Sequence, residues 1–230
     1  MSAASTAAAP IPLKGLRGSI ARNVSAGWLA PQVAMGIDVE MTRCLRLAEE
    51  RQSRAGSGER VTMTAVVLRA LALALKAHPR LNACVTDAGI ELAGSVNLGF
   101  AVALEDGLMV PVIRNADAKS IEELAAESRE LADGARKGAL PPKAYQGGTF
   151  TLSNLGPAGI DWFTPILNPP QVAILGTGRV AQRIAHRAGA MHAVPMMTAV
   201  LVFDHRAVDG EPAARFLRHL GERIESIDGL

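Results

Sequence analysis

The longest apolar stretch of the chain, residues 65–77, limits the possible folds more than any other segment. Most of its positions are Ala, Val or Leu, and its two charges, Arg69 and Lys76, lie seven positions apart. In an α-helix that spacing places both charges on one stripe and leaves the other faces apolar. The stretch is also shorter than the ~20 residues needed to span a bilayer. It therefore predicts a core helix buried on nearly every side, and we expect no association with a membrane.

The composition is that of one ordinary globular domain. The 230 residues are 49% hydrophobic and 20% charged, which suits a large single domain with a sizeable core. The formal charge of +2 offers no strong field for nucleic acid or an anionic membrane. Cys44 and Cys84 lie far apart without C-x-x-C spacing. They predict buried, reduced thiols, and neither a disulfide framework nor a zinc site.

The first residues differ from the rest in composition. Residues 1–12 are rich in Ala and contain two prolines, which predicts a flexible Ala/Pro-rich tail ahead of one domain over residues 13–230. No charged region precedes an apolar core there, as a secretory signal requires. We therefore expect a cytoplasmic protein.

Hydrophobic periodicity and turn signals predict an α/β fold. Helices are expected at residues 13–26, 42–54, 65–77, 120–136 and 210–226, and strands at 35–40, 96–104, 108–113, 149–153, 171–176 and 193–204. Ser120 and Glu123 have the spacing of a capping box, and Asp106-Gly107 predicts a hairpin. Because a hairpin argues against a purely parallel sheet, we expect a two-layer sandwich with helices packed on a mixed β-sheet. The capped helix is expected to bury Ile121, Leu124, Ala125, Ser128, Leu131 and Ala132.

A polar cluster at residues 204–210, Asp-His-Arg-Ala-Val-Asp-Gly, abruptly ends the last apolar strand. An imidazole with a pKa near ~6.5 can accept and return a proton at neutral pH, as a general base does. A thiol with a pKa near ~8.5 is mostly protonated at pH 7, so a base beside it raises the reactive thiolate fraction. His205 is therefore a candidate base for thioester exchange.

A plainer interpretation of this cluster stays open. His205 can be a strand-end histidine satisfied by local hydrogen bonds, and Asp209 can cap the last helix, with Pro212 in its first turn. Asp209 can also support an active site. If its carboxylate is buried, it needs an arginine partner. The candidates are Arg17, Arg22 and Arg206.

A second signal is the segment 147–157, Gly-Gly-Thr-Phe-Thr-Leu-Ser-Asn-Leu-Gly-Pro, a short alternating strand that ends in hydroxyl, amide and glycine. Thioester exchange passes through a tetrahedral intermediate with a negatively charged oxygen, and one well-placed donor is worth ~10²–10³ in rate. The Ser153 hydroxyl can be such a donor. Alternatively, Ser153 and Asn154 simply form a turn.

The remaining histidines give weaker signals. His186 and His192 fall in an expected loop without carboxylates or cysteines nearby, so we interpret them as surface residues. His78 and His219 have no evident partners. We therefore predict no metal site.

With further motifs, these segments indicate a family. The chain resembles the catalytic domain of the dihydrolipoamide acyltransferases, the core components of 2-oxo-acid dehydrogenase complexes. The resemblance covers about residues 16–220. It includes HPRLNA at 78–83, VNLGFAV at 96–102, DGLMVPVIRNAD at 106–117, FTPILNPPQVAILG at 163–176, GGTFTLSNLG and FDHRAVDG.

The resemblance implies an acyltransferase catalytic domain over residues 13–230 with a fold like that of chloramphenicol acetyltransferase. It implies acyl exchange between coenzyme A and a dihydrolipoyl carrier, with His205 as general base, Ser153 as oxyanion donor from the neighbouring subunit and Asp209 as support. It further implies homotrimers, which often build larger cages, and lipoylated carrier domains and dehydrogenase subunits as partners. The resemblance assigns no residues for binding coenzyme A.

Two departures from the family's pattern keep other functions open. A short Ala-rich tail stands where members usually carry lipoyl and subunit-binding domains, so we expect an excised core or a lipoyl group supplied in trans. Pro31-Gln32 stands where many members have Pro-His. The alternatives are a non-catalytic trimeric or cage-forming scaffold, and an acyl-coenzyme A transferase that uses a hydroxyl or amine acceptor.

Overall fold

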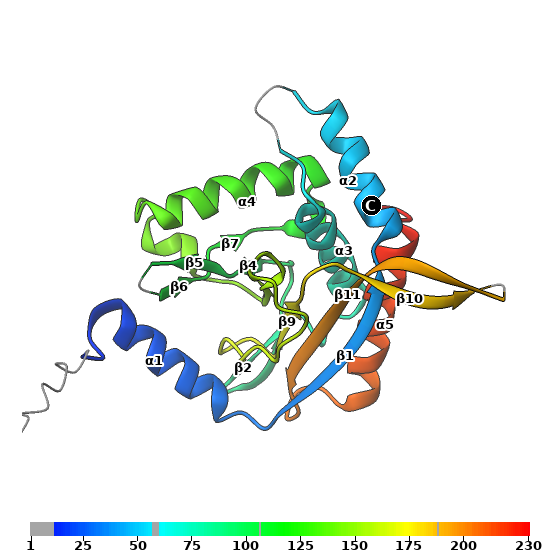
Figure 1. The fold of residues 1–230 in the computed structure, drawn as a ribbon. Coiled ribbons are helices and arrows are strands. Elements are labelled where there is room, and N and C mark those ends of the chain that lie inside the picture. Colours follow the sequence, from blue (N-terminus) through cyan, green and yellow to red (C-terminus); the bar gives the residue numbers. More distant parts are fainter. Residues whose placement is uncertain (1–11, 57–59, 106, 188) are drawn as a thin grey trace, which may run out of the picture.

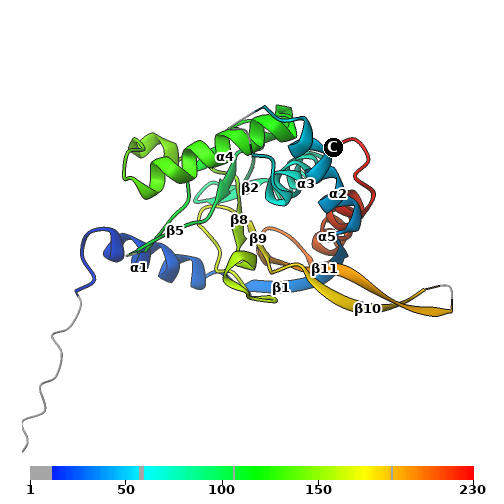
Figure 2. The same ribbon diagram turned by 45° about the horizontal axis from the view of Figure 1, so that its top comes forward.

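The computed structural model describes residues 12–56, 60–105, 107–187 and 189–230. A mixed β-sheet forms one layer, and four helices gather on one of its faces to form the other (Figures 1 and 2). This arrangement confirms the predicted two-layer α/β sandwich. The predicted tail lies almost entirely outside the described residues, so the division at residue 13 stays a prediction.

The four covering helices differ in burial from the first helix of the chain. They are α2 (Thr42–Arg54), α3 (Met63–Ala77), α4 (Ile121–Arg136) and α5 (Gly210–Ser226). Helix α1 (Gly15–Trp28) lies at the opposite end of the sheet from α5 and exposes Trp28 (Figure 1). Short 3₁₀ turns are η1 (Ala116–Ala118), η2 (Pro142–Tyr145) and η3 (Gly156–Ala158).

The main sheet has seven strands in the order β1-β11-β9-β8-β4-β7, with β10 paired to β11. Strand β8 runs parallel to both β4 and β9, and the other pairs are antiparallel. The main strands are β1 (Gln32–Glu40), β4 (Leu98–Phe100), β7 (Val112–Ile113), β8 (Phe150–Asn154), β9 (Ala173–Thr177), β10 (Ala181–Arg187) and β11 (Ala190–Asp204). Two small ribbons are β2 (Ala83–Thr86) with β3 (Gly89–Leu92), and β5 (Val102–Leu104) with β6 (Gly107–Met109).

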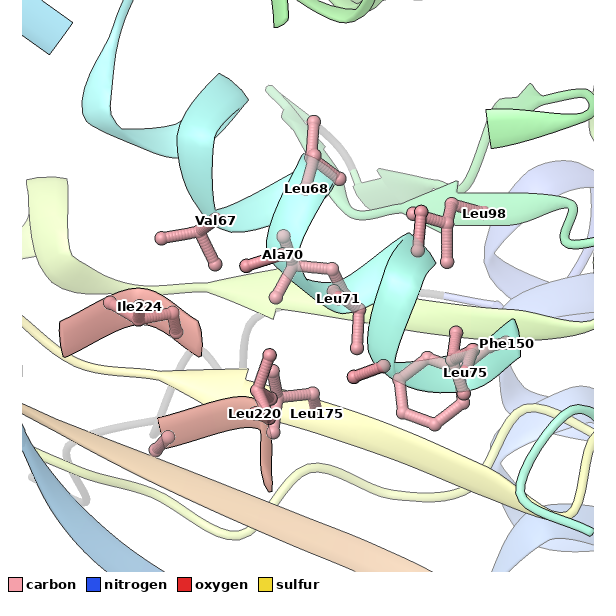
Figure 3. Packing of buried hydrophobic residues seen from close by; sticks show 14 of the residues in the cluster. Val67, Leu68, Ala70, Leu71, Leu75, Leu98, Phe150, Leu175, Leu220 and Ile224 are labelled. Atoms are coloured by element: carbon pink, nitrogen blue, oxygen red, sulfur yellow. The ribbon is translucent and has the colours of Figure 1, made fainter. Parts of the chain in front are cut away.

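Helix α3 lies at the centre of the core, as its apolar composition predicts. Leu71 and Leu75 are fully buried, and they pack with Phe150 of the sheet and Leu220 of α5 (Figure 3). Burying a leucine contributes roughly 1.5–3 kcal/mol. The two charges of α3 share one partner, since Arg69 donates to the backbone oxygen of Asp117 and Lys76 pairs with its carboxylate.

Local signals predicted most helix boundaries correctly. Helices α2 and α5 have the expected bounds, and both hydrogen bonds of the Ser120–Glu123 capping box are present. In α4 the predicted burial holds for Ile121, Leu124 and Ala125, whereas three further residues are only half-buried. These are Ser128, Leu131 and Ala132.

The strand predictions were less accurate. The expected hairpin forms, but it divides into β4–β7 within the main sheet and the separate ribbon β5–β6. Its predicted turn residue Asp106 lies outside the described residues. Strand β10 was missed, and His186 and His192 lie on the paired strands β10 and β11 instead of a loop. Both imidazoles are exposed, as expected.

The state of the two cysteines and the apolar character of the helices were both predicted from composition. Cys44 and Cys84 are free thiols. Burial raises the pKa of the Cys44 thiol to about 12, whereas Cys84 is only half-buried, contrary to the prediction. Within the described ranges, no helix has both the length and the apolar character needed to cross a membrane.

The expectation that His78 and His219 have no partners was wrong. His78 Nε2 lies 3.0 Å from His219 Nδ1, and Arg223 Nε donates to His219 Nε2. Because arginine can only donate, His219 carries its proton on Nδ1 and donates it to His78. This chain of hydrogen bonds joins the end of α3 to α5 and requires both imidazoles to be neutral.

We expect acid to weaken the fold through His78. Burial, and then the electrostatic influence of His219 and Arg215, lower the pKa of His78 below 6.5 in the folded protein. The contribution of His78 to the free energy of unfolding is therefore constant above about pH 6.5 and declines as the pH falls below it, because the unfolded chain then binds the proton more tightly. Denaturant titrations from about pH 7.5 to about pH 5 measure this decline.

His78→Gln keeps an acceptor for His219 but does not titrate, so its stability should depend less on pH than that of the wild type. His186→Gln changes an exposed histidine on β10 and should retain the wild-type dependence. Equal pH dependence in the wild type and His78→Gln would contradict the expected role of His78.

Candidate functional site

His205 lies immediately after the end of β11. Its backbone N–H donates to the Pro31 oxygen at 2.9 Å, which ties the turn to the segment before β1. Its side chain is 46% exposed and lies beside the ring of Phe203, with the ring centres 5.9 Å apart. Among the described residues, no hydrogen bond to the imidazole is formed. The plainer interpretation thus has support only at the backbone, because the local hydrogen bond of His205 is made by its N–H and not by its imidazole.

Asp209 is the acidic group beside this imidazole. Its Oδ1 atom lies 3.9 Å from His205 Nδ1, which is too far for a hydrogen bond but close enough for electrostatic interaction. Asp209 is the N-cap residue of α5, but its side chain accepts no capping hydrogen bond. The side chain is 79% exposed in the single chain, so the burial that would require an arginine partner is not present there.

The arginine of the same motif pairs with a different carboxylate. Arg206 contacts Asp204 through two nitrogens, and the shortest distance is 2.6 Å. Asp204 is buried, and sequence reasoning overlooked it. Its position as the last residue of an interior strand was the available signal, because a carboxylate buried there needs a cationic partner.

Ser153 is placed by the sheet and not by a turn. It is half-buried in β8, and it pairs with Gly176 in β9, which in turn pairs with Val200 in β11. Val200 belongs to a small cluster separate from the main core, whereas the neighbouring Leu152 belongs to that core. Ser153 therefore lies on the face of the sheet opposite the helices.

The sheet register separates Ser153 from His205 in one chain. Ser153 aligns with Val200, two strands away, and Val200 precedes His205 by five residues. At ~3.3 Å per residue and ~4.8 Å per strand, their Cα atoms are on the order of 15–20 Å apart. The two groups cannot contact the same reacting atoms within one chain.

The segment after Ser153 is held by close backbone packing. Asn154 accepts a hydrogen bond from the Gly156 N–H and donates to Thr64 at 3.5 Å. A Cβ atom at Gly178 would lie only 1.8 Å from the Asp161 oxygen, so only glycine permits this approach. Ser153 and Asn154 are thus the last two residues of β8 instead of a turn, and the Asn154 side chain holds the turn that follows.

The Pro31-Gln32 departure lies beside the candidate base. Gln32 pairs with Asp204 across β1 and β11, and Pro31 accepts the His205 hydrogen bond. The Gln32 Oε1 atom is buried and has no hydrogen-bond partner among the described residues. The change from histidine therefore leaves an unsatisfied acceptor next to the motif.

The cavities of the single chain do not bring the predicted residues together. A cavity of about 830 Å³ lies over β1 and β11, and its lining includes the pairs Asp38–Arg183 and Asp161–Arg179. It contacts neither Ser153 nor His205. In the part of the chain that the structure describes, no group of three or more His, Cys, Asp or Glu side chains could hold a metal ion.

Sequence comparison assigns this arrangement to a known family. The model of the 2-oxoacid dehydrogenases acyltransferase catalytic domain matches residues 6–230. The chain belongs to this family. A relative from Bacillus subtilis (strain 168), the dihydrolipoyllysine-residue acetyltransferase component of its pyruvate dehydrogenase complex, is 38% identical over 228 residues. The match covers 93% of this chain and 52% of the relative.

Other family members agree with this result. The corresponding component of the B. subtilis acetoin cleaving system is 38% identical over 218 residues, covering 94% of this chain and 55% of the relative. The chain thus spans about half the length of these curated relatives. The family model and these relatives therefore lead to the same family assignment for the catalytic domain.

Solved structures of the family have the same fold. One comes from a study of the roles of a serine, a histidine and an asparagine in the catalytic mechanism of Azotobacter vinelandii dihydrolipoamide acetyltransferase. It is 36% identical with a TM-score of 0.92, covering 97% of this acyltransferase domain and 93% of that chain. Chloramphenicol acetyltransferase, at 14% identity and a TM-score of 0.57 over 93% and 98% of the two chains, shares the fold alone.

Gly178→Ala should destabilise this acyltransferase domain. The added methyl group would clash with the Asp161 backbone oxygen, and relieving the clash requires displacing the loop that follows Ser153. We expect a loss of about 1–3 kcal/mol or more in the free energy of unfolding, measured by denaturant titration. Gly94→Ala is the control, because its Cβ would meet nothing within 4 Å. Equal stability of the two variants would refute the proposed close packing.

Proposed function

We propose that this chain exchanges acyl groups between coenzyme A and a dihydrolipoyl carrier, with His205 as general base. The observation that carries the proposal is an exposed imidazole, without a hydrogen-bonded partner among the described residues, at the end of strand β11 in a family acyltransferase domain. The serine, histidine and asparagine studied in the A. vinelandii enzyme have the same separations along the chain as Ser153, His205 and Asp209. This agreement supports all three assignments.

The chemistry follows from these groups. His205 takes the proton from the attacking thiol, and the thiolate adds to the thioester carbonyl. The Ser153 hydroxyl donates a hydrogen bond to the oxygen that becomes negatively charged. When the intermediate collapses, the departing thiolate takes the proton back from the imidazolium. Coenzyme A and the lipoyl group are both substrates, and the lipoyl group comes in trans on a carrier domain.

The active site must be shared between two copies of the chain. Since Ser153 and His205 lie on the order of 15–20 Å apart in one subunit, a neighbouring subunit has to supply one of them. A closed ring of identical subunits provides the same contact at every interface. We therefore propose a homotrimer that can assemble further into a cage, as supported by a 36% identical relative from the cubic core of a pyruvate dehydrogenase complex.

Asp209 has the role of support. Its carboxylate lies 3.9 Å from the imidazole, where it can stabilise the positive charge that develops when His205 accepts a proton. In the A. vinelandii enzyme an asparagine lies at the position of Asp209, the same number of residues after the histidine. The supporting charge of Asp209 is therefore a difference between this chain and that enzyme.

The proposal extends to partners and compartment. Dehydrogenase subunits and a lipoylated carrier domain are the proposed partners, in line with the complexes named for the relatives. Two free cysteines fit a reducing compartment, so we propose the cytoplasm.

Replacing the proposed base gives the direct test. His205→Ala should lower kcat by on the order of 10²–10⁴ in transfer from acetyl-coenzyme A to dihydrolipoamide, because no other group takes the thiol proton. Alcohols and amines in parallel assays distinguish thiol exchange from transfer to other acceptors. His192→Ala, on the exposed part of β11, is the control and should behave as wild type. Full activity of His205→Ala would rule out His205 as the general base. If the wild type is inactive on every acceptor, the non-catalytic scaffold is favoured instead.

Mixed oligomers test the shared site. Ser153→Ala should lower kcat by ~10²–10³ with little change in KM, because the oxyanion exists only in the transition state. When Ser153→Ala and His205→Ala chains are co-expressed, about a quarter of the interfaces in a randomly mixed ring receive both intact residues, so activity should return to about that level. Purification through two different tags removes the unmixed trimers. One interface in three is intact in each mixed trimer, so the purified trimers should reach about a third of wild-type activity. If they are as inactive as the parent variants, the two residues do not act across an interface.

A further inference from the structure

The residue before His205 anchors the turn on which the base sits. Asp204 is only 2% exposed, and its backbone N–H donates to the Val172 oxygen at 2.8 Å. Its own oxygen accepts from the N–H groups of Ala207 and Val208, at 3.0 and 3.1 Å. The chain therefore leaves β11 through a turn that is closed around His205.

The residue after His205 is tied to the same carboxylate. Arg206 Nε lies 3.0 and 3.1 Å from the two Asp204 oxygens, and Nη2 lies 2.6 Å from Oδ2. The Arg206 backbone N–H donates to Asp204 Oδ1 at 3.0 Å. The flanking residues of His205 are thus joined to each other through both side chain and backbone. We call the contact between Asp204 and Arg206 the flanking clamp.

The imidazole itself depends on the backbone for its position. Its nearest charged neighbour, Asp209, is 3.9 Å away, and 46% of the side chain is exposed. The backbone N–H of His205 bonds to Pro31, which fixes the residue on one side of the turn only. A change in the turn would consequently move the imidazole without breaking any side-chain hydrogen bond of its own.

The clamp stays charged over the pH range in which an imidazole titrates. Burial alone would raise the pKa of Asp204, but the hydrogen bonds and charge of Arg206 outweigh it and hold the pKa below its usual value. The Arg206 side chain is 57% exposed, whereas that of Asp204 is 3% exposed. An exposed ion pair contributes little to stability, but here one partner is buried and two-point contact defines the geometry.

We propose that Arg206 is a positioning residue, which acts through its clamp on Asp204 to hold the turn that presents His205 to the thiol. This inference rests on the proposed role of His205 as base. A positioning role differs from a role in fold stability, because loss of a purely stabilising residue would lower the melting temperature and leave kcat unchanged. It also differs from binding a phosphate of coenzyme A, which would raise KM.

Arg206→Gln tests the proposal in the assembled protein, assayed well below its melting temperature. We expect kcat to fall by roughly 10–10²-fold with KM for both acetyl-coenzyme A and dihydrolipoamide nearly unchanged, since a displacement of about 1 Å at a catalytic group has this effect. Arg206→Lys should lose less than Arg206→Gln, because an ammonium keeps the charge opposite Asp204, but it should still lose activity, because it cannot make both contacts. Arg136→Gln is the matched control. Its side chain is 59% exposed, and it pairs with the exposed Asp133, so kcat should not change.

A double variant separates positioning from every additive role. If Arg206 acts through His205, His205→Ala combined with Arg206→Gln should be no slower than His205→Ala alone. Three results would each overturn the proposal. The losses of kcat could multiply in the double variant, KM for acetyl-coenzyme A could rise in Arg206→Gln, or Arg206→Gln could have wild-type kcat. Should Arg206→Gln fail to assemble, wild-type kcat in Arg206→Lys overturns it equally. High activity of His205→Ala would instead show that the proposed base is wrong.

Discussion

The structure depends on the fixed position of β11 between two hydrogen-bonded neighbours. β1 pairs with it on one side and β9 on the other, and the register places Asp204 opposite Gln32. Alternate residues of β11 serve different faces: Leu201 joins the main core, whereas Val202 packs in the smaller cluster opposite. A shift of one residue would exchange these faces, so the register is strongly specified. The end of β11, and with it the start of the His205 turn, therefore has one defined place.

The core supports this strand from the helical side. α3 is buried through most of its length, and α5 packs against both α3 and β1 (Figure 2). Because α5 begins directly after the motif, the turn at His205 lies between two rigid elements. The pairing of Asp204 with Arg206 then closes this turn locally. Rigid support of this kind suits a base whose imidazole has no hydrogen-bonded partner of its own among the described residues.

The division of the candidate site follows from the same sheet. Ser153 lies in the interior of the strand order, two strands from β11, and on the face away from the helices. His205 lies beyond the end of β11. A sheet holds its strands at constant spacing, so no side-chain rotation can bring the two residues together. One copy of the chain presents two half-sites, and association of copies is a requirement of the proposed chemistry.

The sequence predicted features whose causes are local. The capping box at Ser120, the bounds of α2 and α5, and the central burial of α3 all follow from neighbouring residues and helical periodicity. The family motifs also identified His205 and Ser153 as residues to examine. Prediction was poorer for β10, whose mixed residues show no apolar pattern and become a strand through pairing with β11. It also failed for His78 and His219, which are far apart in sequence and meet only where α3 packs on α5.

By itself, the sequence determined which segments are helical, which are interior, and which side chains can carry acid–base chemistry, because these depend on residue type and short-range spacing. Only the tertiary structure decided that Arg206 pairs with Asp204, that Asp209 is exposed, and that Ser153 and His205 lie too far apart in one chain to contact the same atoms. Those outcomes depend on strand order and register, through which residues distant in the chain acquire their neighbours, and no local pattern encodes such distances.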